Sequence, residues 1–266
     1  MKQSCTILLL SLTLGSALPT AASANSGGVD NLFATIPDND PNGIQSSQTL
    51  TGIPRAVSHV SVTLNVSGGF NGDLYAYLLH NSTQAVLLNR VGRTGTSGVG
   101  YPDAGFGLDA SSSSFTFDDQ ASHDVHFYRI FSYVLNGSGQ LTGSWQPDGR
   151  ALDPESAGSA FVTAPRSNPL SLFNGMDGNG LWTLFVADVA PLGESTLVSW
   201  GLDISIVPEP ASATLLCCGL GGRAVLASDP ASKGQGIENC DRIGQLAELW
   251  DYLFRVVGLA RSVNSR

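Results

Sequence analysis

The sequence predicts an all-β protein whose single folded domain is a jelly-roll-like antiparallel β-sandwich. Apolar and polar residues alternate along several short stretches, which is the pattern of strands with one face in a core. Turn-forming residues separate these stretches, and the 266 residues include 31 glycines and 13 prolines. Between residues 25 and 206 no stretch shows the apolar period of a helix longer than one or two turns. Many short strands with many turns are typical of sandwiches.

The first predicted strands form an antiparallel meander. Residues 60–66 alternate strictly between Val or Leu and a polar residue. A glycine-rich turn at 68–72 follows, and then two apolar stretches at 74–79 and 85–88 that are separated by a short polar turn. We therefore expect three consecutive strands that pair with their sequence neighbours.

The middle of the chain has a weaker pattern. Residues 91–114 are rich in Gly and Ser and predict a long loop. Phe115 and Phe117 resume the alternation, and we expect residues 125–128 to extend it as a short strand.

The strongest pair of predicted strands comes late. Residues 181–187 are almost continuously apolar, as in a strand that is covered on both faces. After a loop, residues 198–206 alternate between apolar and polar residues. Trp182 and Trp200 lie within these apolar patterns, so we expect both indoles to pack in the core rather than to form a ligand platform.

Several motifs in these strands resemble the P domain, or Homo B domain, of kexin- and furin-like proprotein convertases. The motifs are Gly72-Asp73-Leu74, the block from Asn179-Gly180-Leu181-Trp182 to Asp188, and Leu197-Val198-Ser199-Trp200-Gly201-Leu202. The resemblance covers roughly residues 50–206, without the long middle loop. It implies a jelly-roll-like sandwich that accompanies a subtilisin-like peptidase domain and supports its folding, while the catalytic residues lie in that other domain.

The N-terminus predicts a secretory signal peptide over residues 1–24. Lys2 provides the positive start, residues 6–17 form a short apolar run, and Ala22-Ser23-Ala24 supplies the small residues that a signal peptidase reads. We expect an N-terminal arm over 25–49, followed by the sandwich over 50–206.

Residues 207–226 resemble the PEP-CTERM sorting signal of Gram-negative bacteria. Val207-Pro208-Glu209-Pro210 precedes an apolar run, although this run is only about half the length of a membrane span and a single Arg223 follows it. The resemblance implies processing by an exosortase, transient contact with the inner membrane and a final place in the outer envelope or medium.

The tail over 227–266 departs from that signal. Apolar residues recur there at three- and four-residue spacing from Ile243 to Val257, and Asp241 can cap the start, so an amphipathic helix is predicted. Two readings stay open for it, a helix that binds a partner or membrane surface and a tail that comes from a shifted reading frame.

The net charge of −9 disfavours nucleic acid as a partner, because phosphate binding requires a basic face. No cysteine occurs between residues 25 and 206, so the sandwich has no disulfide and depends on its core.

The sequence favours calcium over zinc as a bound metal. Calcium takes oxygen ligands from loop carboxylates, and five aspartates flank predicted strands: Asp73, Asp118, Asp119, Asp177 and Asp188. Aspartate also favours turns for purely structural reasons. Zinc would need His123 and His126 together, and these would lie on opposite faces of a strand.

We expect no catalytic residues in this chain. Ser97 follows Gly95-Thr96, but Val99 breaks the Gly-x-Ser-x-Gly pattern of hydrolases. Four histidines are present, and a triad is defined by geometry rather than by composition. Two functions remain. The first is a non-catalytic envelope or matrix module that binds a surface polymer or protein; the second is an accessory P domain of a separate subtilisin/kexin-like serine endopeptidase.

Overall fold

The computed structural model describes residues 22–29, 31–95 and 98–207. The predicted signal peptide up to residue 21, the PEP-CTERM-like segment beyond Val207 and the tail lie outside these residues. The described elements are, in order, β1 (Ala22–Val29), β2 (Ala34–Ile36), β3 (Asp40–Leu50), β4 (Val57–Gly68), η1 (Asn71–Asp73), β5 (Leu74–His80), β6 (Thr83–Asn89), β7 (Gly105–Phe106), β8 (Phe115–Asp118), η2 (Val125–Ile130), β9 (Ser144–Trp145), α1 (Gly158–Thr163), η3 (Leu170–Phe173), β10 (Gly180–Asp188) and β11 (Ser195–Ile206).

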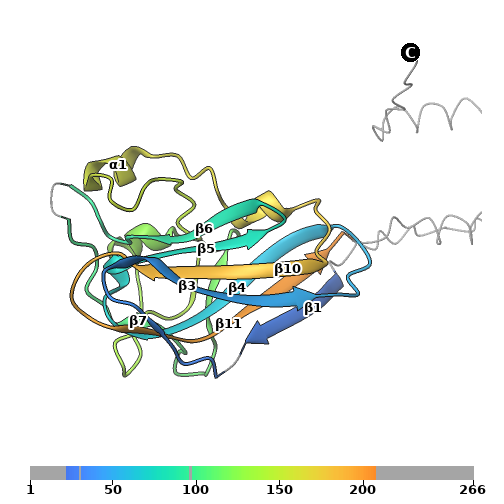
Figure 1. The fold of residues 1–266 in the computed structure, drawn as a ribbon, viewed down its shortest axis with the longest axis horizontal. Helices are drawn as coiled ribbons and strands as arrows, with labels where there is room; N and C mark the ends of the chain where they lie inside the picture. The colour runs from blue at the N-terminus through green and yellow to red at the C-terminus, as the bar shows by residue number, and fades with distance from the viewer. Residues whose placement is uncertain (1–21, 30, 96–97, 208–266) are drawn as a thin grey trace, which may run out of the picture. The chain divides into compact units, whose positions relative to one another are not determined.

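The strands form two sheets that pack face to face, as the all-β prediction requires (Figure 1). One sheet has the order β1-β11-β4-β8-β9, with β2 added to β11 and β7 added to β4. The other has the order β3-β10-β5-β6. All pairings between named strands are antiparallel except that of β8 with β9, which is parallel.

The core lies between the two sheets and is built from the predicted alternation. In β4 and β11 the apolar residues face inward, and their register places Leu64 opposite Trp200. Trp182 and Trp200 are both buried, which confirms their expected packing. The indole N–H of Trp200 donates to Ser46 Oγ at 2.8 Å and that of Trp182 donates to the Gly178 carbonyl at 2.9 Å. Both polar groups are thereby satisfied inside the core.

The strands begin well before the predicted boundary at residue 50. Residues 25–49, which we expected to form an arm, instead belong largely to β1, β2 and β3. β1 pairs with β11 from Ala22 onward, so it also includes the last residues of the predicted signal peptide. β3 is the edge strand of its sheet and pairs only with β10. Its residues 45–49 are all polar, because an edge strand can expose one face to water, and periodicity therefore does not reveal it.

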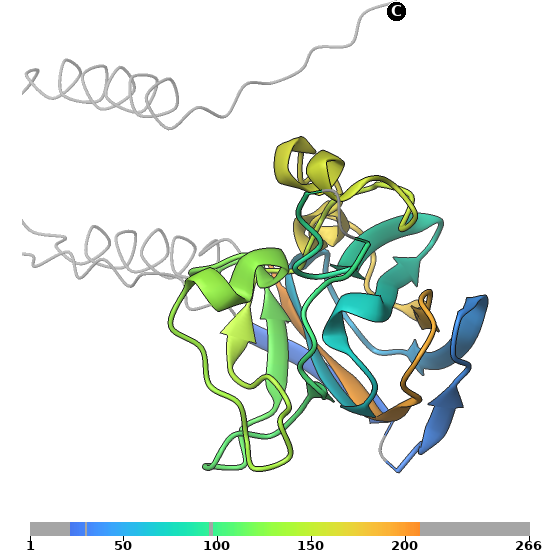
Figure 2. The same ribbon diagram turned by 90° about the vertical axis from the view of Figure 1, so that its left-hand side faces the viewer.

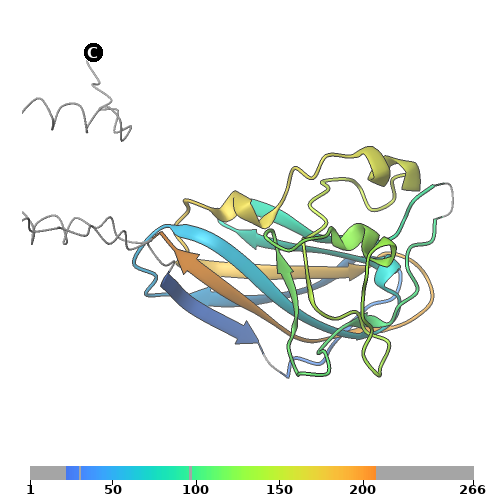
Figure 3. The same ribbon diagram turned by 180° about the vertical axis from the view of Figure 1, so that it is seen from behind.

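Residues 125–128 correct a second expectation, because they form the start of the 3-10 helix η2 rather than a strand. Asp124 caps this helix, and its side chain accepts the N–H of His126 at 2.9 Å. Figure 2 shows the segment that carries η2 along one side of the sandwich. Figure 3 shows α1 and η3 above the strands of the smaller sheet, and η3 contacts β6. Within the described part of the chain, no helix is long and apolar enough to cross a membrane.

Candidate functional site

The structure brings only two of the five predicted calcium ligands to the same place. Asp118 lies 3.3 Å from His59 Nε2, and Asp119 accepts the N–H groups of Leu170 and Ser171 at the start of η3. Asp177 accepts the backbone and side-chain N–H groups of Asn179. These three carboxylates thus each stabilise a separate turn or strand end. In the described residues no group of three or more His, Cys, Asp or Glu is placed to hold a metal ion.

Asp73 and Asp188 lie together at one end of the smaller sheet. Asp188 ends β10 and pairs in register with Leu74, the residue after Asp73. The Val189 N–H also donates to the Asp73 carbonyl at 2.9 Å. Both side chains are buried, and Asp188 is fully so. Burial raises the pKa of Asp188 to about 6, and the nearby charges of Asp73 and Asp38 add to the rise.

Arg90 provides the cation beside this pair. Its Nη2 atom lies 3.6 Å from Asp73 Oδ1, and its Nη1 atom lies 3.2 Å from Glu155 Oε1. The guanidinium also donates to the carbonyls of Gly72 and Gly98, at 2.8 and 2.9 Å. One buried arginine therefore holds together the turn before β5, the loop after β6 and the segment around residue 155.

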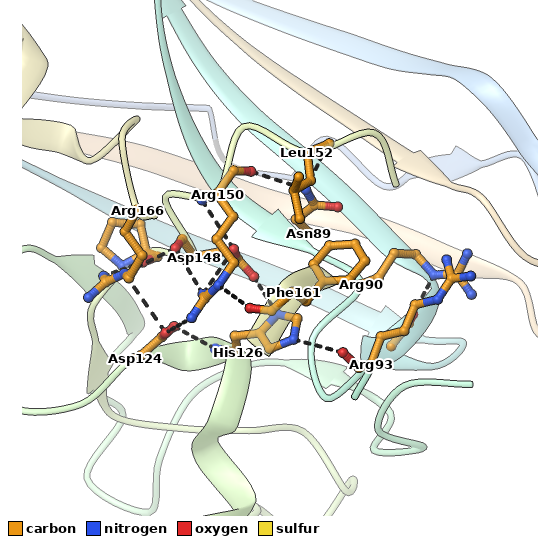
Figure 4. Close-up of polar contacts among 12 residues, drawn as sticks. Asn89, Arg90, Arg93, Asp124, His126, Asp148, Arg150, Leu152, Phe161 and Arg166 are labelled. Atoms are coloured by element: carbon orange, nitrogen blue, oxygen red, sulfur yellow. Dashed lines mark hydrogen bonds and ion pairs between the residues drawn. The ribbon is translucent and has the colours of Figure 1, made fainter. Parts of the chain in front are cut away.

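A larger polar network surrounds His126 (Figure 4). His126 Nδ1 lies 2.6 Å from Asp148 Oδ2, and both side chains are fully buried. Arg150 donates to Asp124 at 2.7 Å and to Asp148 at 3.2 Å. Arg166 donates to the Asp148 carbonyl at 3.0 Å. The network ties η2 to the segments before and after α1.

The geometry of His126 differs from that of a catalytic base. Its Nε2 atom faces the Arg93 carbonyl at 3.2 Å, so both ring nitrogens face oxygen acceptors. A catalytic histidine instead needs one nitrogen free to accept the proton of a nucleophile. His126 and Asp148 resemble two members of a triad in composition, but their contacts give them a structural role.

The other three histidines are also engaged. His80 is buried, faces the Leu181 and Asp177 carbonyls at 2.9 and 2.8 Å, and stacks on Trp182. His59 pairs with Asp118, as described above. His123 stacks on Phe131 with ring centroids 3.9 Å apart. Ser97, the serine of the incomplete hydrolase pattern, lies outside the described residues.

Sequence reasoning missed the network around His126 because its members lie in η2 and in loops that are spread over more than forty positions. The amino-acid composition nevertheless contained a sign of buried pairs between arginine and carboxylates. No lysine occurs between residues 22 and 207, so every basic residue of the sandwich other than histidine is an arginine. Arginine suits buried pairing with carboxylates better than lysine does, because its planar guanidinium makes several hydrogen bonds at once.

An open pocket of about 580 Å³ lies beside η2 and β9. Loop hydroxyls surround it, and His123 and Tyr133 supply aromatic surface. Trp145 forms part of its wall and donates its indole N–H to the Thr142 carbonyl at 2.9 Å. Its lining is Asp109, Ala110, Ser111, Ser122, His123, Ser132, Tyr133, Val134, Thr142, Gly143, Ser144 and Trp145.

No protein-family model matches the chain, and no curated protein sequence matches it. Among solved structures, the chain is similar to an Aeromonas sobria serine protease in complex with its chaperone, at 15% identity and a TM-score of 0.37, over 72% of this chain and 28% of that chain. A structure of the serine protease of Aeromonas sobria is similar at 14% identity and a TM-score of 0.35, over 73% and 28%. The chain thus spans little more than a quarter of those chains. Similarities of this size carry no argument about function.

Proposed function

We propose that the protein is an exported, non-catalytic P-domain-like module of the bacterial envelope or extracellular matrix. In this proposal it binds a surface polymer or a surface protein through the pocket around His123 and Tyr133. The observation that carries the proposal is the chemistry of that pocket. Export and the P-domain assignment are supported by the sequence motifs described above.

The pocket combines the two kinds of group that a neutral, hydroxyl-rich ligand uses. The side chains of Ser122, Ser132 and Ser144 contribute hydroxyls, which can both donate and accept hydrogen bonds, while the Ser111 hydroxyl already donates to Asp109 Oδ1 at 2.7 Å. The rings of His123 and Tyr133 add flat apolar surface beside them. Ligand sites typically pair apolar and aromatic lining with a few polar groups that fix orientation. Because the pocket is open, a chain-like ligand can pass through it without being enclosed.

The experiment that tests this function is a retention assay of the full chain on Gram-negative envelope material. Peptidoglycan sacculi, lipopolysaccharide, exopolysaccharide and membrane-protein fractions are assayed separately. We expect one fraction to retain the protein, and the double variant with His123→Ala and Tyr133→Ala to lose most of this retention. His59→Ala is the matched control, because His59 is half-buried and lies outside the pocket. Equal retention of wild type and double variant, or no retention on any fraction, contradicts the proposal.

A second candidate function is an accessory domain of a separate subtilisin/kexin-like serine endopeptidase. The feature that favours it is an apolar rim at the end of the sandwich near Asp73. Leu192 and Val99 are 74% and 70% exposed there, and Phe70 lies beside them on a pocket of about 540 Å³. Exposed apolar groups around a pocket are typical of protein interfaces. Co-purification of a subtilisin-like peptidase with the wild type, and its loss on Leu192→Asp, supports this candidate; unchanged co-purification contradicts it.

A further inference from the structure

We propose that β3 pairs with the β3 strand of a second copy of this chain, so that the smaller sheets of two molecules continue into one another. This interface is separate from the pocket in the proposed function, and either proposal can fail without the other. The inference combines a free sheet edge, a lack of the features that usually protect such an edge, and a strand whose sequence is complementary to itself.

The first observation is the free edge. β3 is the last strand of the smaller sheet and pairs only with β10 (Figure 1). Among the residues that the structure describes, β3 forms no backbone–backbone hydrogen bond to any other segment. In an antiparallel pair, alternate residues direct their N–H and C=O groups away from the partner strand. β3 therefore presents a row of donors and acceptors that lack a backbone partner.

The opposite edge of the same sheet is closed. At β6, the Asp148 and Gly149 N–H groups donate to the carbonyls of Leu87 and Val86, each at 2.9 Å. The Val86 N–H donates in turn to the Asn168 carbonyl at 2.9 Å. The segments around residues 148 and 168 thus occupy the place that a further strand would take. In the described part of the chain, β3 is the edge at which this sheet stays open.

The second observation is that β3 lacks the usual protection of an edge strand. Natural edges carry charged side chains, proline or a bulge, which prevent pairing with another chain. In β3, both Pro41 and the register shift, which falls between Val186 and Asp188 of β10, lie near the beginning of the strand. From Ile44 to Leu50 the register is regular, and none of these residues is charged or a proline. A regular, uncharged edge is a template for the addition of a strand.

The third observation is that the sequence of β3 fits a second copy of itself. Gln45, Ser47 and Thr49 are exposed on the outer face, whereas Ile44 and Leu50 turn toward the core. When two β3 strands pair antiparallel about Ser47, the midpoint of the regular stretch, Gln45 faces Thr49 and Ser47 faces its own copy. On the inner face Ile44 faces Leu50. Polar side chains thus meet polar ones, apolar side chains meet apolar ones, and no like charges come together.

The larger sheet does not pair with this edge. β1 approaches the inner side of β3, where a Cβ atom on Gly27 would lie 2.5 Å from Gln48 Oε1, but β1 forms its ladder with β11. β9, beside the pocket around His123, ends the larger sheet at the edge opposite to β1. Pairing through β3 therefore leaves that pocket free in both copies.

The test is the molar mass of the full chain, measured by size-exclusion chromatography with light scattering over a range of protein concentrations. We expect a dimer that dissociates on dilution. Ser47→Lys and Ser47→Glu each place two like charges opposite one another, so each variant alone should be a monomer. An equimolar mixture of the two variants should form a dimer again, because opposite charges then face each other.

Ser138→Lys is the matched control, since Ser138 is exposed in a turn outside β3 and its replacement should leave the dimer unchanged. The pocket variant with His123→Ala and Tyr133→Ala should also remain a dimer, which separates this interface from the proposed ligand site. The proposal is overturned if the wild type is a monomer at every concentration, if Ser47→Lys dimerises as the wild type does, or if the mixture stays monomeric. Circular dichroism checks that the variants fold; should Ser47→Lys fail to fold, a dimeric Ser47→Glu overturns the proposal.

Discussion

His126 Nδ1 lies 2.6 Å from Asp148 Oδ2 in a place where neither side chain reaches solvent. The pair joins η2 to the segment before α1, and Arg150 Nη1 lies 3.2 Å from Asp148 Oδ1. Neither segment adds a long strand to the two sheets. A buried polar network therefore joins these segments, while η2 also contributes the apolar side chains of Val125 and Tyr128 to the core.

Asp148→Ala tests how much that network contributes to the free energy of unfolding. The substitution leaves Arg150 and the ring of His126 buried without their shared carboxylate, and breaking a buried ion pair in this way costs about 3–5 kcal/mol. We expect the free energy of unfolding, measured by urea denaturation of the full chain, to fall by that amount. Glu194→Ala, at an exposed position, should change it by less than about 0.5 kcal/mol. A similar small change for Asp148→Ala contradicts a central role of the network.

Asp188 should make stability depend on pH in a direction opposite to that of most aspartates. Burial raises its pKa from 3.8 to about 6 in the folded protein, so the folded state binds more protons than the unfolded state between these values. Its contribution to stability is therefore fully present below pH 3.8 and is lost as the pH rises through about 6. The difference approaches about 3 kcal/mol.

Urea denaturation in EDTA between pH 4 and pH 7 measures this dependence. Subtracting the profile of Asp188→Asn from that of the wild type isolates the contribution of Asp188. A flat difference profile contradicts the raised pKa.

Arg129 should protect the protein against acid. Burial tends to raise the pKa of Asp103, but hydrogen bonds from Arg129 and Tyr128 outweigh burial and lower it below 3.8. A carboxylate with a lowered pKa stabilises the folded state above its unfolded pKa, and this stability is lost as the pH falls. Arg129→Ala should thus move acid unfolding, followed by circular dichroism, to a higher pH.

Arg129→Lys keeps the charge but loses the two hydrogen bonds that the guanidinium makes to Asp103, at 2.8 and 2.6 Å. We expect an intermediate acid midpoint for this variant. If Arg129→Ala unfolds at the same acid pH as the wild type, the lowered pKa of Asp103 does not depend on Arg129.

Gly72→Ala should be destabilising, because a Cβ atom at residue 72 would lie about 2.4–2.5 Å from backbone atoms of Gly100 and Tyr101. Overpacking of this kind costs about 1–3 kcal/mol. Gly137→Ala is the matched control, since a Cβ there meets no atom within 4 Å and the backbone is not left-handed. Thermal unfolding of both variants compares them, and an equal Tm would show that the loop around Gly100 moves aside freely.

The sequence predicted two kinds of strand: those with one apolar and one polar face, and those that are buried on both faces. β4 and β11 follow from alternation, and β10 follows from its continuous apolar run. It did not predict β3, whose polar residues lie at a sheet edge, or η2, whose conformation depends on the cap from Asp124.

The candidate site was predictable only in part. Asp73 and Asp188 were both selected from their positions at strand ends, but the convergence of β5 and β10 is a property of the sheet order. The approach of Asp38 depends on a contact with Leu192 across 154 positions of the chain. The other three aspartates, Asp118, Asp119 and Asp177, also flank predicted strands. Only the tertiary structure shows that they lie apart from Asp73 and Asp188.

The parallel pairing of β8 with β9 has a consequence for how this protein can diversify. β9 is two residues long and ends its sheet, and its residues Ser144 and Trp145 form the pocket around His123 together with the adjacent loops. Substitutions or insertions in those loops leave the buried faces of β4, β10 and β11 untouched. If the pocket binds a ligand as proposed, its specificity can therefore be changed by substitutions in these loops while the strands of the core stay the same.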